Sequence, residues 1–272
     1  MKSFLFIIPL TPKKIRVGQR EVLWSLCKKT LLSQTYENWK AIIIGEDRNF
    51  QPQNNNHFHL IPYEGRKEEK LQKATEYIIQ NNIPGDYIIR LDDDDIINPT
   101  ILKKVANLDF DLYVDKYQWF WYYESGMVSN RVWHWFPNTC IHKREHALAE
   151  WGDYAKGDFK RFKEQALLIE NDHSQLHPYY KNKKVVFADK NHPVYLRTIT
   201  FTSITAKNSK DHEKYLKRFG LWEKNNIQDF QFLKEHINPN YKSLPHYSLK
   251  EKVLLRYYNL RSYFSYSKQI FQ

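Results

Sequence analysis

Short apolar runs alternate with longer amphipathic segments over the first part of the chain. Four runs have the length of buried strands: 4–10, 40–45, 57–63 and 86–92. Between them, residues 17–34 and 68–82 carry apolar side chains at the spacing of a helix face. Strands that alternate with helices predict an α/β fold, in which a mostly parallel central sheet is flanked by helices. Ligands of such sheets bind beyond the carboxyl ends of the strands, so a site is expected there.

Four consecutive aspartates, residues 92–95, stand directly after the last of these strands. Like charges about 4 Å apart repel by on the order of 1 kcal/mol per pair in water and about 4 kcal/mol near a protein surface, so a positive partner is expected. Asn98 and Pro99 predict a helix start, with Asn98 as N-cap and Pro99 at the first helical position. The aspartates therefore occupy a strand-to-helix turn.

Two of these carboxylates, Asp92 and Asp94, point to the same side of an extended backbone. Mg²⁺ and Mn²⁺ prefer oxygen ligands and commonly bridge carboxylates to the phosphates of a substrate. The turn is therefore a candidate metal site, and a solvated acidic turn is the alternative. Arg90 precedes the turn on the side of Asp92, and we expect the two to pair.

Residues 111–136 are dense in aromatic side chains. The segment Glu124-Ser125-Gly126 predicts a tight turn and hence a hairpin. Because both alternating faces are aromatic, we expect one face in the core and the other toward a cleft or a partner. Aromatic rings suit the apolar faces of sugars. The candidates for an acceptor site are Trp119, Trp121, Trp133 and Trp135, with core packing as the alternative.

The composition is that of a folded chain: 272 residues, 42% of them hydrophobic, enough for one large domain with or without an extension. The two cysteines, Cys27 and Cys140, exclude a disulfide framework and zinc-ligand spacing, and they fit a reducing cytosol. Residues 3–10 are too short to span a membrane and no small-residue cleavage site follows, so they predict a first strand. A cytoplasmic location is expected.

The formal charge of +11 suits nucleic acid, an anionic membrane face or phosphorylated substrates. No zinc finger, RNP-type motif or basic heptad region occurs, so we expect no nucleic-acid partner. Residues 206–272 are polar and basic, and Lys, Arg and Tyr alternate there with Leu and Phe. This segment is expected to be a basic helical extension that lies on the inner face of a membrane or packs on the preceding domain.

Three segments together resemble the nucleotide-binding half of the family 2 glycosyltransferases with the GT-A fold: FIIPL at 6–10, SQTYENWKAIIIGED at 33–47 and GDYIIRLDDDD at 85–95. The resemblance covers residues 3–105 well and continues more loosely to 205. It implies a GT-A-like, Rossmann-type domain over 1–205, with a nucleotide-sugar half at 1–105 and an acceptor half at 106–205. It further implies transfer of a hexosyl or deoxyhexosyl group, in the synthesis of a cell-envelope polysaccharide, to a glycan or lipid-linked acceptor.

The family holds Mn²⁺ or Mg²⁺ with an Asp-x-Asp motif, so the resemblance assigns the metal to Asp92, Asp94 and Asp95. The residues expected to meet the nucleotide diphosphate are Pro9, Thr11, Asp47, Arg66, Lys70, Lys73, Arg90, Asp92 and Asp93. The chain departs from the family in two places. Residues 45–48 read Gly-Glu-Asp-Arg where the family often has Asp-Asp-Gly-Ser, and GRKEEKLQK replaces the usual Arg-Asn segment. Solvated helix lysines are the alternative for Lys70 and Lys73.

Inverting sugar transfer needs a carboxylate that takes the proton of the acceptor hydroxyl. In the family this residue lies just before a helix, which points to Asp172, with Glu170 as second choice and a plain helix cap as the alternative. Asp153 and Asp158 are weaker candidates. His173 and His177 are expected to be structural. Among the four tryptophans, Trp133 and Trp135 are assigned to the acceptor, and His192 or Arg197 could close over the diphosphate.

Three other functions compete with this interpretation. A sugar nucleotidyltransferase shares a related fold but needs a Gly-rich loop after the first strand. Residues 9–20 contain a single glycine, Gly18. A phosphatase with an Asp-x-Asp nucleophile would carry its motif after the first strand rather than the fourth. A non-enzymatic basic binding module is the last alternative, and it would bind nucleotide sugars without turnover.

Overall fold

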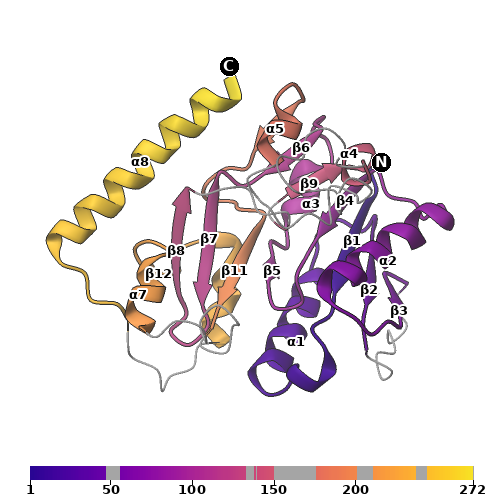
Figure 1. Ribbon diagram of the computed structural model, residues 1–272, viewed down its shortest axis with the longest axis horizontal. Coiled ribbons are helices and arrows are strands. Elements are labelled where there is room, and N and C mark those ends of the chain that lie inside the picture. Colours follow the sequence, from indigo (N-terminus) through magenta and orange to yellow (C-terminus); the bar gives the residue numbers. More distant parts are fainter. Residues whose placement is uncertain are drawn as a thin grey trace.

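The computed structural model describes residues 1–46, 56–132, 138, 140–149, 176–200, 211–236 and 244–271. Two sheets lie side by side within one body, and helices cover them (Figure 1). The four strands that the sequence predicts in the first part of the chain supply four of the seven strands of the first sheet, and the aromatic hairpin belongs to the second.

The first sheet has seven strands in the order β10-β6-β9-β4-β1-β2-β3. Its strands are β1 (Phe4–Pro9), β2 (Trp39–Ile44), β3 (Phe58–Ile61), β4 (Tyr87–Arg90), β6 (Leu112–Val114), β9 (Cys140–Lys143) and β10 (Val185–Phe187). β9 runs antiparallel to β4 and β6, and the other neighbours pair in parallel. The predicted α/β fold with a mostly parallel central sheet is confirmed.

Strand β1 shows why this sheet is buried on both faces. Phe4 and Phe6 pack into the cluster that contains side chains of α1 (Gln19–Leu32) and α3 (Ile101–Val105). Leu5 and Ile7 point to the opposite face, into the cluster with α2 (Lys67–Gln80) and the short α4 (Arg144–Ala147). An uninterrupted apolar strand is thus matched by a helix layer on each side.

The second sheet has the order β12-β8-β7-β11-β5. Its strands are β5 (Ile96–Ile97), β7 (Tyr117–Tyr122), β8 (Met127–Val132), β11 (Tyr195–Ile199) and β12 (Glu223–Lys224). β7 and β8 form the predicted hairpin, in which Gly126 adopts a φ of 69° that favours glycine. Because β4 ends where the aspartates begin and β5 follows them, residues 92–95 connect the two sheets.

Both faces of strand β7 are covered, so the expectation of an aromatic face toward a cleft or partner is wrong. Trp119 and Trp121 pack against α1 and the 3-10 helix η6 (Gln228–His236). Phe120 and Tyr122 pack against α7 (His212–Lys217) on the other side. Trp119 and Trp121 are therefore core residues and not an acceptor site.

The helix after the aspartates starts later than the sequence predicts. Thr100 is the N-cap of α3, and Asn98 does not cap the helix as expected. Instead, the Asn98 side-chain oxygen accepts a hydrogen bond from the Thr100 amide two residues on (2.9 Å), which is an Asx turn. Its Nδ2 donates to Pro193 O (2.8 Å) and so ties this turn to the segment before β11.

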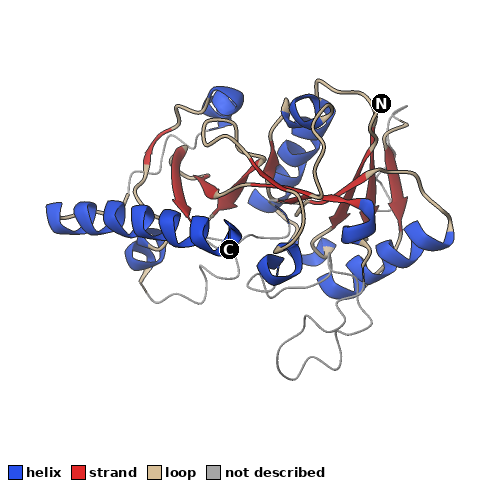
Figure 2. Cartoon of the chain, turned by 90° about the horizontal axis from the view of Figure 1, so that it is seen from above, coloured by secondary structure: helices blue, strands red, loops and turns tan. Residues whose placement is uncertain are grey.

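Residues 211–236 belong to the body of the molecule, because β12 pairs with β8 while α7 and η6 contribute to two core clusters. The boundary expected at residue 205 stays a prediction. Helix α8 (Leu249–Phe271) lies beyond β8, on the far side of the second sheet from the first (Figures 1 and 2). Two further short elements are η1 (Lys13–Ile15) and α5 (Leu176–Tyr180). Every helix in the described part of the chain is too short or too polar to cross a bilayer.

Candidate functional site

The aspartate turn (residues 92–95) faces a cavity of about 450 Å³. The walls come from the carboxyl end of β1, the starts of α1 and α2, the end of β11, and α7. β1 and β4 are parallel neighbours, so the segments that follow them emerge at the same edge of the sheet. The cavity therefore lies where the fold class predicts a ligand site.

Two of the four carboxylates brace the walls of the cavity. Asp93 accepts hydrogen bonds from the amide and the hydroxyl of Thr11, at 2.7 and 2.8 Å. Asp95 accepts from Asn138 Nδ2 at 2.8 Å and from the Thr198 amide at 2.9 Å. Burial and the charge of Asp94 raise the pKa of Asp93 to about 6, and the same two causes raise the pKa of Asp95 well above its usual range. These contacts hold the β1 loop and β11 against the turn.

The other two carboxylates lie beside basic side chains. Lys67, the first residue of α2, places its Nζ 2.6 Å from Asp92 Oδ2, and Arg90 Nε is 3.9 Å from Asp92 Oδ1. Burial opposes ionisation of Asp92, but the charges of Lys67 and Arg90 outweigh it and lower its pKa to about 2. Asp94 Oδ2 is 3.6 Å from Arg20, and burial together with the charge of Asp92 raises its pKa.

Positive charge around the turn thus comes from the protein itself. Arg20 pairs with Asp94, and Lys67 pairs with Asp92. Arg90 is buried beside Asp92, and Arg197 of β11 lines the same cavity. A cavity with carboxylates and fixed cations side by side can hold both a metal ion and an anionic group. The N-terminus of α2 also lies at this cavity, and the dipole of the helix favours negative charge there.

Three of the carboxylates fit a divalent cation. Asp92, Asp94 and Asp95 each offer an oxygen, and these atoms lie within 4.8 Å of one another. Asp92 Oδ1 is buried and accepts no hydrogen bond from the described residues, which leaves a lone pair for a ligand. Oxygen-only donors suit Mg²⁺ or Mn²⁺.

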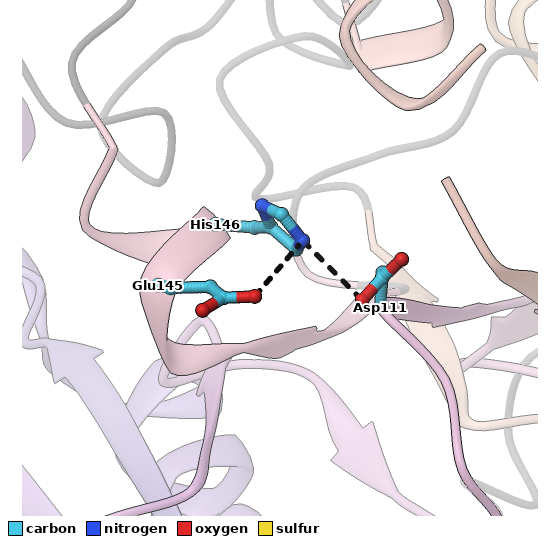
Figure 3. Close-up of side chains that lie close together, drawn as sticks. All are labelled: Asp111, Glu145 and His146. Atoms are coloured by element: carbon cyan, nitrogen blue, oxygen red, sulfur yellow. Dashed lines mark ion pairs between the residues drawn. The ribbon is translucent and has the colours of Figure 1, made fainter. Parts of the chain in front are cut away.

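In a second group of possible metal ligands, Asp111, Glu145 and His146, the His146 ring already contacts both carboxylates (Figure 3). His146 Nε2 lies 3.4 Å from Asp111 and 3.6 Å from Glu145. Lys143 Nζ lies 2.8 Å from Glu145 and 3.7 Å from Asp111, so its ammonium offsets part of the charge of the two carboxylates. This group has the character of an ion-paired cluster on the surface.

The structure brings several of the residues expected from the sequence to the cavity. Pro9, Thr11 and Arg66 line it, and Arg66 also pairs with Glu69 at 3.0 Å. Lys70 lines it too, but its Nζ donates to Leu10 O (2.8 Å) and the residue is only 1% exposed.

Other expected residues lie elsewhere. Lys73 is not among the residues that line the cavity, and its Nζ lies 3.5 Å from Glu76 on the same helix. His192 binds Asp229 through Nδ1 at 2.7 Å and does not line the cavity either. The expected residues outside the described ranges are Asp47, Trp133, Trp135, Asp153, Asp158, Glu170, Asp172 and His173, and the side chain of His177 is also outside them.

Sequence reasoning missed Arg20, Lys67 and Tyr215, which also line the cavity. Lys67 directly follows Arg66 and is the first residue of α2. Its place in the first turn of a helix that begins at the cavity is the feature of the sequence that could have identified it. Arg20 stands in the first turn of the helix that follows β1, at the same edge of the sheet. Nothing in the sequence marks Tyr215, because it reaches the cavity from α7, far along the chain.

Solved structures with a similar fold include TarS of Staphylococcus aureus in complex with UDP, with a TM-score of 0.45 and 12% identity over 73% of this chain and 61% of that one. The glycosyltransferase GlyE of Streptococcus pneumoniae TIGR4 has a TM-score of 0.41 and 12% identity over 96% of this chain and 64% of GlyE. The bifunctional IspDF of Campylobacter jejuni has a TM-score of 0.39 and 12% identity over 69% of this chain and 49% of IspDF.

This chain thus spans less than two thirds of the length of each of these three. No family model matches the chain, and no curated protein sequence matches it. Similarity at this level concerns the fold alone, so the function has to be inferred from the cavity.

Proposed function

We propose that the chain is a glycosyltransferase that binds a nucleotide diphosphate sugar at the aspartate turn and transfers the sugar to a glycan or lipid-linked acceptor. The observation that carries the proposal is the cavity itself, where three convergent carboxylates lie beside Arg20, Lys67 and Arg197. A metal-bound diphosphate is the ligand whose charges match both sets of groups.

Asp92, Asp94 and Asp95 are the residues that would hold Mn²⁺ or Mg²⁺. When bound, the ion would stabilise the negative charge of the departing nucleotide diphosphate. The hydrogen bonds from Asn138 and Thr198 orient Asp95 for this role.

Lys67, Arg20 and Arg197 bind and orient the diphosphate in this proposal. Their positions are set by α2, α1 and β11 before any ligand arrives, so little reorganisation is needed as charge develops on the leaving group. Lys67 and Arg20 would share their hydrogen bonds between the carboxylates and the phosphate oxygens.

Asp172 is the proposed general base, with Glu170 as second choice, and Trp133 and Trp135 are proposed to contact the acceptor. The acceptor oxygen would bond to the anomeric carbon as the bond from that carbon to the diphosphate oxygen breaks. Asp172 would take the hydroxyl proton. A single displacement of this kind inverts the anomeric configuration.

The decisive experiment is a thermal-shift and calorimetric titration with nucleotide diphosphates and their sugars, with and without Mn²⁺. A true ligand should stabilise the folded chain by about 2.7 kcal/mol at a hundredfold excess over Kd, and only when metal is present. Asp94→Asn should abolish most of this gain. Asp94 suits the test because Arg20 is its one ion-pair partner among the described residues and its side chain is 30% exposed.

Asp109→Asn is the matched control, since the Asp109 side chain is 82% exposed and its ion-pair partner in the described part of the chain is Lys184, outside the cavity. If Asp94→Asn binds a nucleotide diphosphate as tightly as the unaltered chain in Mn²⁺, the metal assignment is wrong. Release of pyrophosphate from a nucleoside triphosphate and a sugar phosphate would identify a nucleotidyltransferase instead.

A further inference from the structure

Helix α8 carries a continuous apolar stripe on the side that faces away from the body. The stripe consists of Leu249, Val253, Tyr257, Leu260 and Phe264, which follow one another at intervals of three or four residues. At 3.6 residues per turn this spacing places all five on one side of the helix. Their exposed fractions lie between 56% and 80%. An exposed apolar patch of this kind usually marks a surface that binds a protein or a membrane.

Basic residues flank the stripe on both sides. At 3.6 residues per turn, Lys250 and Arg261 lie along one border of the stripe, and Lys252 and Arg256 lie along the other. All four are exposed. The one acidic residue of the helix, Glu251, lies on the opposite side, where it binds Lys217 at 2.9 Å. The outward side of α8 is therefore apolar in the middle and positive at its borders.

The inward side of α8 contacts the second sheet, and these contacts turn the stripe away from the body of the molecule. Asn259 accepts a hydrogen bond from the Val132 amide and donates to Asn130 O, both at 3.3 Å. These are backbone groups of β8, so the Asn259 side chain covers the outer edge of that strand. The ring of Tyr263 stacks on Tyr117 with centroids 5.9 Å apart. The helix thus lies beside β8 (Figure 1), and the exposure of the stripe shows that it is turned outward.

We propose that the outward side of α8 docks on an anionic lipid surface. An interfacial helix buries its apolar side in the boundary between head groups and acyl chains, while Lys and Arg at its borders meet the anionic head groups. The stripe and its two basic borders match this arrangement. A second copy of the chain is a poorer occupant, because pairing two stripes would bring basic borders together.

The test is flotation of the full chain with vesicles of equal parts phosphatidylcholine and phosphatidylglycerol, compared with vesicles of phosphatidylcholine alone. The chain should bind the anionic vesicles more tightly and lose binding as salt is added. Lys250→Gln and Arg261→Gln should each lower the partition coefficient about fivefold. Leu260→Ser should lower it about tenfold, because the leucine would no longer enter the acyl region.

Two controls match these variants. Ile79→Ser, on α2, changes a side chain with the same 57% exposure as Leu260, and Lys103→Gln removes an exposed charge from α3. Neither should change vesicle binding. Absence of binding, equal binding to both vesicles, or equal effects of Leu260→Ser and Ile79→Ser would overturn the proposal. If Leu260→Ser converts a dimer into a monomer in sedimentation and leaves vesicle binding unchanged, a second copy covers the stripe.

Discussion

The four aspartates of the turn differ in their partners, and these partners determine what a substitution at each of them changes. Asp93 and Asp95 accept hydrogen bonds from groups that belong to other segments, and both are nearly fully buried. Removing a buried acceptor of this kind costs about 1–3 kcal/mol, so changes there test the fold as well as the site. Asp92 and Asp94 are more exposed and pair with long basic side chains, so changes there test ligand binding more directly.

Lys67→Met should weaken the binding of a nucleotide diphosphate in Mn²⁺ by about tenfold or more, because a hydrogen bond to a charged group contributes about 1.5–3 kcal/mol. Methionine keeps the length of the side chain and removes its charge. The matched control is Lys73→Met, since Lys73 lies on the same helix and pairs with Glu76 away from the cavity. Titration calorimetry measures both variants. Equal weakening by the two substitutions would show that Lys67 has no special role.

Asp172→Asn should bind donor and metal normally and lose transfer to the acceptor by about 10²- to 10⁴-fold, the usual contribution of a positioned base. Slow hydrolysis of the donor should survive, because water needs less accurate positioning than a sugar hydroxyl. Glu170→Gln is the control and should have a milder effect. An active Asp172→Asn beside an inactive Glu170→Gln would transfer the role to Glu170, and two active variants would remove the base from this segment.

At the scale of elements, β11 lies between two strands of the second sheet and also contacts the aspartate turn. It pairs in parallel with β7 and antiparallel with β5, its Thr198 amide binds Asp95, and Arg197 enters the cavity from it. The segment before β11 is held by Asp115, whose carboxylate accepts from the Val194 amide at 2.9 and 3.0 Å. The position of one wall of the cavity therefore depends on a buried carboxylate that follows β6.

Burial raises the pKa of Asp115 well above its usual range, although the Val194 and Tyr195 amides oppose the rise. The folded chain therefore holds this proton more tightly than the unfolded chain does. The resulting stability is fully present below the unfolded pKa of about 4 and is lost as the pH rises toward the folded pKa. Asp115→Asn removes this contribution, so the free energy of unfolding of the variant should fall less with rising pH.

Urea unfolding at a series of pH values above about 4 measures the difference for Asp115→Asn. Asp109→Asn is the control. Lys184 lowers the pKa of Asp109, so its contribution is present above the unfolded pKa and lost as the pH falls. Because that loss occurs below about pH 4, its removal should leave the slope above pH 4 unchanged. If the free energy of unfolding changed with pH equally in the unaltered chain and in Asp115→Asn, the expectation would be contradicted.

At the scale of the molecule, the cavity lies where the two sheets meet, and α8 lies beyond the second sheet (Figures 1 and 2). Docking of α8 on a lipid surface would leave the lining residues of the cavity untouched, since none of them belongs to α8. Variants of the stripe should therefore separate lipid binding from nucleotide binding.

The sequence by itself determined four of the seven strands of the first sheet, β1 to β4, the helices α1 and α2, and the position of the aspartate turn. Those features are local, because the apolar runs and the helical spacing reflect which side chains face a core. The hairpin at Gly126 was equally readable, since its turn needs a residue that tolerates positive φ.

Only the tertiary structure decided which groups surround the turn and which aromatic residues are buried. Arg20 and Lys67 meet the aspartates because α1 and α2 begin at the edge where β4 ends, and sequence separation says nothing about that meeting. Aromatic side chains on both faces of β7 predicted one free face, but α7 covers the second face from nearly a hundred residues away. Burial is decided by the layers that pack on a strand, and those layers come from distant parts of the chain.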